Sequence, residues 1–595
     1  MLEGKTLKQA AGLRILDPAC GSGSFLLGAY EYLLKWHLDF YIKNEPTKWA
    51  RGGKSALVQV SGGDWKLTIA ERKRILLANI YGVDIDAQAV ETTKLSLLLK
   101  VLEGETQQSL QPVLLTFQER ALPDLGDNIK CGNSLIGPDF YQQQLLPLDE
   151  EARYRINVFD WKKEFAEIFA GGGFDAVIGN PPYISVELTI KDVTEYYLSK
   201  FRSASGRANS FSVFIEQAIE LLKHKGLLGF IVSNRILTNT QLAPLRKLIL
   251  EDSTIQNILT FKKAVFKAAV DTAVLICEKE EPSPTHSIEI WSDITDLENS
   301  HYLLNKVPQA LFLKAPFQLF NVKQKEGSQA LIQKILNKSI ELSRICDVKD
   351  GIILGGIKEL FLSSKRINGR YEKWLEGNEV SRYAINWEGR FILYDKSLIE
   401  EELKRKRQSA KARAITAADF GKLSRSGIWL RTPEVFRQEK ILTRQNAKRL
   451  IGTLDNEQFF VKNSLHSIIL EDTDYSLRYV LGLINSKLLN FYFQDQIGGT
   501  GEVFSQMKIA YIRKLPLRPI NFSSKSDKSR HNQMVRLVDE MLGLQRRLVS
   551  AKTPQEKTSV ERQISATDAQ IDRVVYDLYG LTPEEITIVE TAGSV

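Results

Sequence analysis

The segment LRILDPACGSGSF, residues 13–25, carries a short apolar run that ends in an acidic residue and two closely spaced glycines. This order is typical of a buried strand that gives way through a tight turn to a helix. Glycine there lets backbone amides come close to a ligand at the N-terminus of the helix. The segment therefore predicts a strand–turn–helix unit with a ligand site at its turn, although such turns also need glycine for geometry alone.

The same alternation of short apolar runs and longer helical patterns continues to about residue 280. Strand-like runs such as NIYGVDI (79–85) and FDAVIGN (174–180) are separated by helical patterns such as AVETTKLSLLLKVL (89–102). This alternation indicates a doubly wound α/β domain with a mainly parallel sheet, which we expect over residues 1–285. Two insertions, at about residues 35–65 and 138–170, are expected to be peripheral.

The second half of the chain has a different texture. After a charged, proline-containing boundary we expect a linker at residues 286–325. In residues 326–522, short β-like runs stand between basic and glycine-containing loops, which indicates a mixed α+β domain. Residues 530–549 and 556–578 show helical apolar spacing on either side of a proline-containing turn. This spacing predicts an antiparallel helical hairpin within residues 523–595.

Composition and charge indicate a globular protein with a basic surface. The 595 residues, 43% hydrophobic and 26% charged, imply three or four domains and exclude a chain that is disordered throughout. The net charge of +8 is uneven, because residues 401–450 hold 14 Lys and Arg against 5 Asp and Glu. This local excess of +9 favours a nucleic-acid partner, with a solvated helical face as the alternative.

Cysteine and histidine spacing gives no sign of a metal site. The four cysteines lie far apart without CxxC spacing, which argues against a disulfide framework or a cysteine zinc site. The six histidines show neither an HExxH motif nor close pairing. The first residues lack an apolar signal-peptide region, and no apolar run approaches the ~20 residues that span a bilayer. We therefore expect no metal, no membrane partner and a reducing cytoplasmic setting.

Two further strand ends carry polar groups. FDAVIGNPPY, residues 174–183, runs from a buried strand straight into Asn180 and two prolines. Consecutive prolines lack an N–H and have a fixed φ, so they end the ladder and hold the loop rigid. Such a loop would aim the Asn180 side chain and nearby carbonyls at one spot. In YGVDID, residues 81–86, a strand ends at Asp84, whose carboxylate could accept bonds from both hydroxyls of a ribose.

In this order the motifs resemble those of the S-adenosylmethionine-dependent N6-adenine DNA methyltransferases of the γ arrangement. More closely, the chain looks like the methylase-specificity part of type IIG restriction-modification enzymes with a TaqI-like specificity domain, from Leu13 to about Glu590. The resemblance implies a Rossmann-like methyltransferase sheet that uses S-adenosylmethionine. It also implies methylation of a flipped adenine at a defined site in double-stranded DNA, in a restriction-modification or phage-defence system.

The resemblance also implies roles for individual residues. The catalytic loop would comprise Asn180, Pro181, Pro182 and Tyr183. The cofactor would contact Asp17, Ala19, Gly21, Gly23, Asp84 and Asn133. The target base would stack on Tyr183 and on Phe266, for which plain core packing is the alternative. No metal or covalent nucleophile is needed, because the methyl donor is already activated.

The basic stretch at residues 424–450 interleaves arginine and lysine with aromatic and amide side chains. Arginine can bridge guanine, glutamine or asparagine can bridge adenine, and lysine mostly meets phosphate. This stretch resembles the start of the specificity domain. We expect a DNA-facing group made of Arg431, Arg444, Gln445, Lys448 and Arg449.

Two alternative functions and one departure from the family remain. Some protein and RNA methyltransferases also use NPPY, and a DNA-specificity subunit or fragment could carry a catalytically impaired methyltransferase half. The family closes its cofactor pocket with a segment upstream of the first motif, which the twelve residues before Leu13 do not match. We therefore expect an upstream or separate chain to complete the pocket, or weak cofactor binding. We find no nuclease motif in these residues. We expect that any nuclease lies in the upstream region or on the separate chain.

Overall fold

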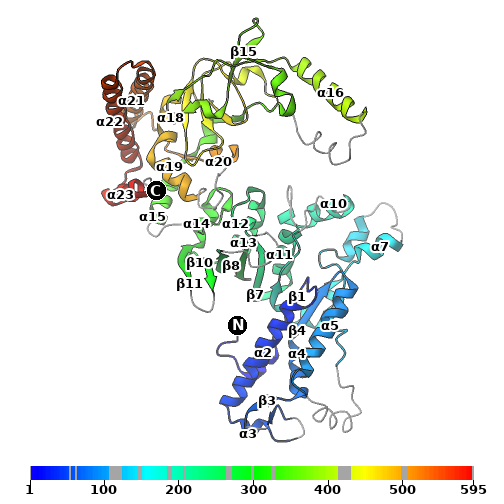
Figure 1. Cartoon of the computed structure of the whole chain (residues 1–595). Helices are drawn as coiled ribbons and strands as arrows, with labels where there is room; N and C mark the ends of the chain where they lie inside the picture. Colours follow the sequence, from blue (N-terminus) through cyan, green and yellow to red (C-terminus); the bar gives the residue numbers. More distant parts are fainter. Residues whose placement is uncertain are drawn as a thin grey trace. The chain divides into compact units, whose positions relative to one another are not determined.

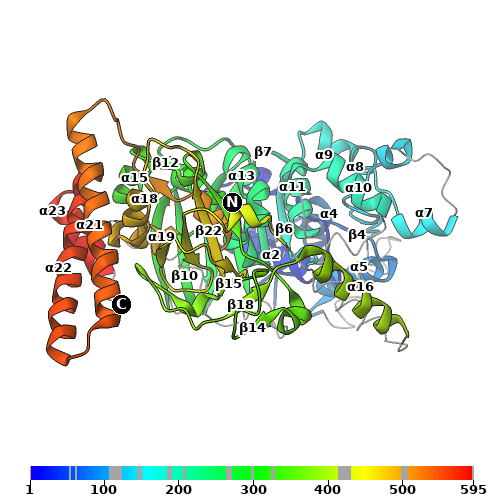
Figure 2. The same ribbon diagram turned by 90° about the horizontal axis from the view of Figure 1, so that it is seen from above.

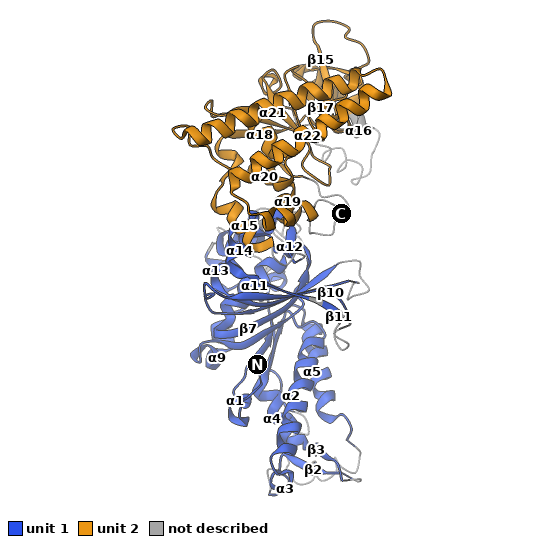
Figure 3. Cartoon of the chain, turned by 90° about the vertical axis from the view of Figure 1, so that its left-hand side faces the viewer, with its two compact units in different colours: residues 1–322 blue, residues 323–595 orange. Residues whose placement is uncertain are grey.

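The computed structural model describes most of the chain (Figure 1). The described residues are 2–52, 55–60, 63–105, 123–143, 150–183, 191–204, 210–262, 271–296, 301–322, 328–412, 430–496 and 507–592. They form two compact units, residues 1–322 and residues 323–595 (Figure 3). Each unit has its own sheets and is described by itself.

The described part of the first unit is built on a nine-stranded sheet of order β11-β10-β8-β9-β7-β6-β1-β4-β5. The strands are β1 (Ile15–Asp17), β4 (Ile80–Asp84), β5 (Ile129–Cys131), β6 (Phe174–Gly179), β7 (Leu222–Ser233), β8 (Thr254–Phe261), β9 (Thr272–Glu278), β10 (Ser287–Asp296) and β11 (His301–Pro308). The run from β5 to β7 is parallel throughout, and β9 and β11 pair antiparallel with their neighbours. The expected mainly parallel α/β sheet is confirmed.

Helices cover the two faces of this sheet. The helices α2 (Ser24–Lys43), α4 (Ile69–Asn79) and α5 (Ala87–Leu102) share one core cluster with Ile15 of β1. The helices α11 (Ser210–Leu221) and α13 (Ala243–Asp252) share another with Leu16. Because successive strand residues point to opposite faces, these two neighbours mark two separate cores. The arrangement is a doubly wound α/β fold.

The prediction of a linker at residues 286–325 is wrong. This segment carries β10 and β11, and β10 pairs in parallel with β8, with Glu289 opposite Asn257. Ile288 and Ile290 alternate into the core and are fully buried. The proline-containing stretch before β10 is therefore a connection inside the sheet, and the first unit continues to residue 322.

The insertion at residues 138–170 is not peripheral either. It forms the 3₁₀ helix η1 (Pro138–Gln143) and the helices α7 (Glu150–Ile156), α8 (Trp161–Glu164) and α9 (Ala166–Ala170). Phe140, Ile156 and Phe159 are buried in the core cluster shared with α11. The earlier insertion contains the end of α2, the helix α3 (Pro46–Trp49) and a hairpin of β2 (Leu57–Gln59) and β3 (Trp65–Leu67).

The second unit has the expected mixed α+β character. One four-stranded sheet joins β13 (Cys346–Asp350), β22 (Leu465–Leu470), β19 (Lys440–Arg444) and β20 (Gly452–Asp455). Another joins β14 (Leu362–Ser363), β18 (Phe391–Leu393), β15 (Tyr371–Leu375) and β21 (Phe460–Val461). The main helices before the C-terminal pair are α15 (Ser328–Asn337), α16 (Lys396–Ala412), α18 (Leu477–Asn485) and α19 (Lys487–Gln496).

The predicted C-terminal hairpin is confirmed as a structure but not as a separate domain. The helices α21 (Lys525–Ser550) and α22 (Pro554–Tyr579) pack along each other (Figure 2). Thr553 caps α22 by accepting a bond from the Glu556 backbone, as its TPQE sequence favours. Arg382 forms two bonds of 3.0 and 2.7 Å with Asp568, which tie the hairpin to the rest of the unit. Across the described residues, none of the helices could cross a bilayer.

Candidate functional site

The turn after β1 is organised by two acidic residues. Asp17 is buried and accepts a bond of 3.0 Å from the Ala19 amide. The Gly21 amide donates to Asp84 Oδ2 at the end of β4, at 2.8 Å. Gly23 has a φ of 83°, and a Cβ there would lie 2.9 Å from a Thr93 side-chain carbon. The sequence needs glycine at this position because both the backbone conformation and the space exclude a side chain.

The Asp84 carboxylate is already partly engaged inside the protein. Besides the Gly21 amide, it accepts the Asp86 amide through Oδ1 at 2.9 Å. A carboxylate offers about four acceptor positions, so two remain for hydroxyls of a ligand. The internal bonds fix its orientation, and Asp84 lines the cavity described below.

The turn after β5 is joined to the turn after β1. Ser134 donates from its hydroxyl to the Pro18 carbonyl. Asn133 accepts the Leu135 amide through Oδ1 at 3.1 Å, which orients its carboxamide. Three neighbouring strand ends, those of β1, β4 and β5, therefore hold polar groups around one place.

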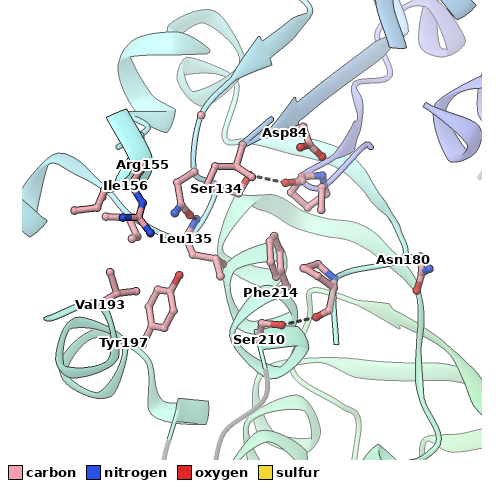
Figure 4. Close-up of a pocket in the computed structure, with 17 residues that line it drawn as sticks. Asp84, Ser134, Leu135, Arg155, Ile156, Asn180, Val193, Tyr197, Ser210 and Phe214 are labelled. Atoms are coloured by element: carbon pink, nitrogen blue, oxygen red, sulfur yellow. Dashed lines mark hydrogen bonds between the residues drawn. The ribbon is translucent and has the colours of Figure 1, made fainter. Parts of the chain in front are cut away.

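These strand ends surround a cavity of about 580 Å³ (Figure 4). Of the predicted site residues, its wall includes Ala19, Asp84, Asn133, Asn180 and Pro182. Asp17, only 2% exposed, lies behind the turn. The volume suits a cofactor-sized ligand, because binding pockets of this kind enclose ~300–1,000 Å³.

Several residues of the cavity wall were not predicted from the sequence. These are Ile85, Ser134, Leu135, Ile136, Arg155, Ile156, Val193, Tyr197, Ser210 and Phe214, with Pro18 and Gly132. Ile85 follows Asp84 directly in the sequence, and this position next to the predicted ribose ligand is the signal that could have identified it. In the structure its side chain is 50% exposed. Arg155 and Tyr197 come from α7 and from α10 (Lys191–Lys200), and no motif in the sequence singles them out. Ile85 and Phe214 give the cavity apolar surfaces that suit a flat ring.

The helix α10 is fixed in place beside this cavity. The Tyr196 hydroxyl lies 2.8 Å from Asp139 Oδ1 and 2.6 Å from Lys200 Nζ, and accepts the Gly137 amide at 3.1 Å. Burial raises the pKa of its neighbour Tyr197 to about 12, against a smaller opposing effect of the Asn133 side chain. The insertion that carries η1 therefore supports one wall of the cavity.

The NPPY loop leaves β6 at Gly179. This glycine has a φ of 151°, and a Cβ there would lie 2.6 Å from Asp17 Oδ1, so the loop packs against the turn after β1. The Tyr183 hydroxyl lies 2.7 Å from Asn180 Oδ1 and 3.1 Å from the Ile231 carbonyl oxygen of β7. Ser210 donates to the Pro182 carbonyl. The loop is thus held at three points, as its two prolines predict.

Burial changes the titration of the acidic residue behind the turn. It raises the pKa of Asp17 to about 7, and the nearby charge of Asp84 adds to the rise against the bond from the Ala19 amide. Asp17 therefore changes protonation near neutral pH. A cation bound close to this turn would favour its charged form and lower that pKa.

The structure places the predicted DNA-facing residues in different roles. Arg444 donates to the Gly377 carbonyl from Nε at 2.6 Å, and Arg431 donates to the Asp350 carbonyl at 3.1 Å. Gln445 is half-buried and pairs through its backbone with Ser464 and Met507. Lys448 and Arg449 are exposed. Phe266, the predicted second stacking residue, lies outside the described residues.

A glycine turn, an acidic strand end and an NPPY loop around one cavity of a doubly wound sheet define the class of S-adenosylmethionine-dependent methyltransferase folds. Within this class, residues 78–266 match the Eco57I restriction-modification methylase family. Residues 372–517 match the TaqI-like C-terminal specificity domain. The chain therefore carries a restriction-modification methylase domain followed by a specificity domain, and the resemblance seen in the sequence is confirmed.

Individual relatives belong to the same systems. The chain is 26% identical over 643 aligned positions to the type II restriction enzyme and methyltransferase RM.Eco57I of Escherichia coli, covering 97% of this chain and 61% of that one. It is 23% identical to the putative type II restriction enzyme and methyltransferase RM.MjaORFECS2P of Methanocaldococcus jannaschii, covering 85% and 48%. It thus spans about half to three-fifths of these relatives.

A solved structure shares the fold. The type IIL restriction-modification enzyme MmeI, determined in complex with DNA, has a TM-score of 0.55 against this chain at 15% identity. The match covers 99% of this chain and 74% of that enzyme. At this identity the likeness concerns the fold alone.

Proposed function

We propose that this chain is the methylase and specificity part of a restriction-modification system, and that it methylates adenine N6 at a defined site in double-stranded DNA. The observation that carries the proposal is the position of Asn180. It stands at the end of β6 and lines the same cavity as Asp84 and Asn133. The amide expected to act in catalysis therefore lines a cofactor-sized cavity, in a chain that also matches a specificity domain.

The residues of the NPPY loop fit the chemistry of an amino group. An adenine amine is a weak nucleophile because its lone pair is delocalised into the ring, and in a duplex it is out of reach until the base is flipped. The Asn180 side-chain oxygen and the Pro181 carbonyl would accept its two protons and localise the lone pair toward the cavity. The rigid loop supplies mainly positioning, which holds reacting groups in line.

The cavity fits S-adenosylmethionine by the chemistry of its wall. Bound there, this cofactor would supply a methyl group already activated on a sulfonium. The free acceptor positions of Asp84 suit the ribose hydroxyls, and Ile85 and Phe214 suit the two faces of its adenine. Asn133 would meet the polar edge of the adenine, and the turn containing Ala19 would meet the methionine part.

The alternatives from the sequence are less well supported. The match of residues 372–517 to a specificity domain favours DNA over protein or RNA as the substrate. An impaired specificity subunit would bind DNA without methylating it. The first relatives are named as both restriction enzyme and methyltransferase, so a polypeptide carrying the nuclease is a further partner in this proposal.

Sequencing of methylated bases in DNA from cells that carry the gene tests the function. We expect N6-methyladenine at one defined sequence, absent from cells with an empty vector. Methylated cytosine at the site would overturn the choice of base. Unmodified DNA, combined with site-specific binding by the purified chain, would favour the impaired subunit.

Cofactor binding is expected to strengthen as pH rises through 7. Burial raises the pKa of Asp17 to about 7, and a bound sulfonium would lower this pKa, so binding is coupled to release of a proton. Between about pH 6 and pH 8 the affinity should rise up to ~tenfold. Calorimetry of S-adenosylmethionine binding in two buffers of different ionisation enthalpy measures the released proton. Equal heats in both buffers would remove Asp17 from this linkage.

Lys448 and Arg449 are expected to govern the salt dependence of DNA binding. Both are exposed, and each phosphate neutralised contributes ~0.9 to the slope of log affinity against log salt. Replacing both with alanine should therefore flatten that slope by about one to two. The matched control replaces Arg546 and Arg547, an exposed basic pair on α21. A slope that changes equally in both variants, or in neither, would contradict a specific contact.

A further inference from the structure

The Tyr183 hydroxyl faces more acceptors than it has protons. It lies 2.7 Å from Asn180 Oδ1 and 3.1 Å from the Ile231 carbonyl oxygen, as placed in the structure. A phenol has one O–H donor and can also accept, whereas both neighbouring oxygens can only accept. In this arrangement the single Tyr183 proton faces two acceptor oxygens. Asn180 donates no hydrogen bond to the phenol oxygen, although that oxygen can accept one.

The tyrosine is well fixed for such a role. Its ring meets Phe211 edge-on, with centroids 5.9 Å apart and planes at 84°. The strands β6 and β7 place Gly179 opposite Phe230, which brings Ile231 beside Asn180. Burial raises the pKa of Tyr183 to about 12, so its proton stays on at neutral pH.

A half-turn of the Asn180 carboxamide resolves the mismatch. Its Nδ2 would then donate to the Tyr183 oxygen, and the Tyr183 proton would go to the Ile231 carbonyl alone. In that chain the Asn180 N–H that faces Tyr183 and the Tyr183 O–H each have one acceptor. The half-turn also moves Oδ1 to the opposite side of the carboxamide, away from Tyr183. A target amine has two protons to donate, so it needs this oxygen and not the amide nitrogen.

We propose that Tyr183 is a positioning residue whose hydroxyl accepts from Asn180 Nδ2 and donates to the Ile231 carbonyl, which turns Asn180 Oδ1 toward the target amine. The inference rests on the proposed function and adds a role for the hydroxyl that stacking of the ring does not need. Phenylalanine would keep the stacking surface and lose both bonds. The Asn180 carboxamide could then turn its Nδ2 toward the target amine. Its N–H would face the N–H of that amine, and no hydrogen bond would form.

The test compares Y183F with the wild-type chain on duplex DNA that contains the unmethylated target site. The single-turnover rate of methyl transfer should fall about tenfold, the effect of one lost hydrogen bond at a buried group. The affinities for DNA and S-adenosylmethionine should stay within about twofold, as should the fluorescence of 2-aminopurine placed at the target base. The control is Y81F, because the half-buried Tyr81 hydroxyl also lies near two backbone carbonyls, each at 3.4 Å.

The outcomes separate this inference from the proposed function. A wild-type chain that transfers no methyl, either alone or with the upstream or separate chain expected to complete the cofactor pocket, overturns both. Normal wild-type transfer with an undiminished rate in Y183F overturns the positioning role alone. A slower Y183F whose 2-aminopurine signal or DNA affinity falls in parallel also overturns it, because the loss then lies in holding the base. Only a slower chemical step with unchanged DNA binding and base flipping supports the positioning role of the Tyr183 hydroxyl.

Discussion

Replacing Asn180 with alanine is expected to lower the single-turnover rate of methyl transfer at least ~hundredfold. The side chain lines the cavity at the end of β6, and alanine removes an acceptor that faces the amine only when the base is in place. Cofactor affinity should change by less than about twofold, because Asp84, Ile85 and Asn133 form the other part of the wall. The rate and the affinity are measured on the same preparation with the same duplex.

Asn180→Asp provides a graded comparison for this result. It keeps acceptor oxygens at the same place but has no amide proton to give to Tyr183, so its rate should lie between those of the wild type and Asn180→Ala. N6-methyladenine formed by Asn180→Ala at a wild-type rate would contradict the catalytic role. A loss explained wholly by weaker cofactor binding would move Asn180 into the cofactor wall.

The sheet was predictable as far as its strands carry their own signal. The runs at β1, β4 and β6 are mostly apolar segments that end in glycine or acidic residues, and each lies where the sequence predicted it. β10 was missed because its pairing partner, β8, is distant in the sequence and a proline-containing stretch stands just before it. Local composition indicates a break in the chain there but does not show whether the chain returns to the sheet.

The site was predictable where one short segment carries the chemistry. Asn180, Asp84 and Asn133 each stand at the end of a strand or within two residues of it, so parallel pairing brings them together at one edge. Arg155 and Tyr197 reach the same cavity from helices whose sequences resemble any amphipathic surface segment. The position of Arg155 depends on packing of the insertion against the core, and that of Tyr197 on the bonds between α10 and this insertion, which no motif encodes.

In the second unit, the count of basic residues did not show which side chains are available to bind DNA. Arg431 and Arg444 belong to the basic stretch, yet each bonds a backbone carbonyl of its own unit. Such arginines satisfy backbone acceptors of the protein itself, and the sequence alone does not distinguish them from arginines that meet a phosphate. Only the exposed Lys448 and Arg449 keep the role that the composition suggested without a competing internal contact in the described structure.

Replacing Lys440 with methionine is expected to destabilise the second unit by ~3–5 kcal/mol. Lys440 and Asp455 pair across β19 and β20, and both side chains are fully buried. Burial lowers the pKa of Lys440 and raises that of Asp455, whereas the opposite charge of each partner favours the charged form of the other. Methionine keeps the volume and leaves the carboxylate without its counter-charge.

A surface pair in the same unit supplies the control for Lys440→Met. Lys373 and Glu457 lie 2.7 Å apart with side chains 36% and 57% exposed, so Lys373→Met should cost less than ~1 kcal/mol. Adding Asp455→Asn to Lys440→Met should recover part of the loss, because the amide carries no charge and its single oxygen still accepts one of the two backbone protons, from Glu457 or Phe459, that the carboxylate accepts. Denaturant midpoints of the full chain measure all four proteins. Equal losses for Lys440→Met and Lys373→Met would show that water reaches the pair, and the sheet would then owe its stability to its apolar core.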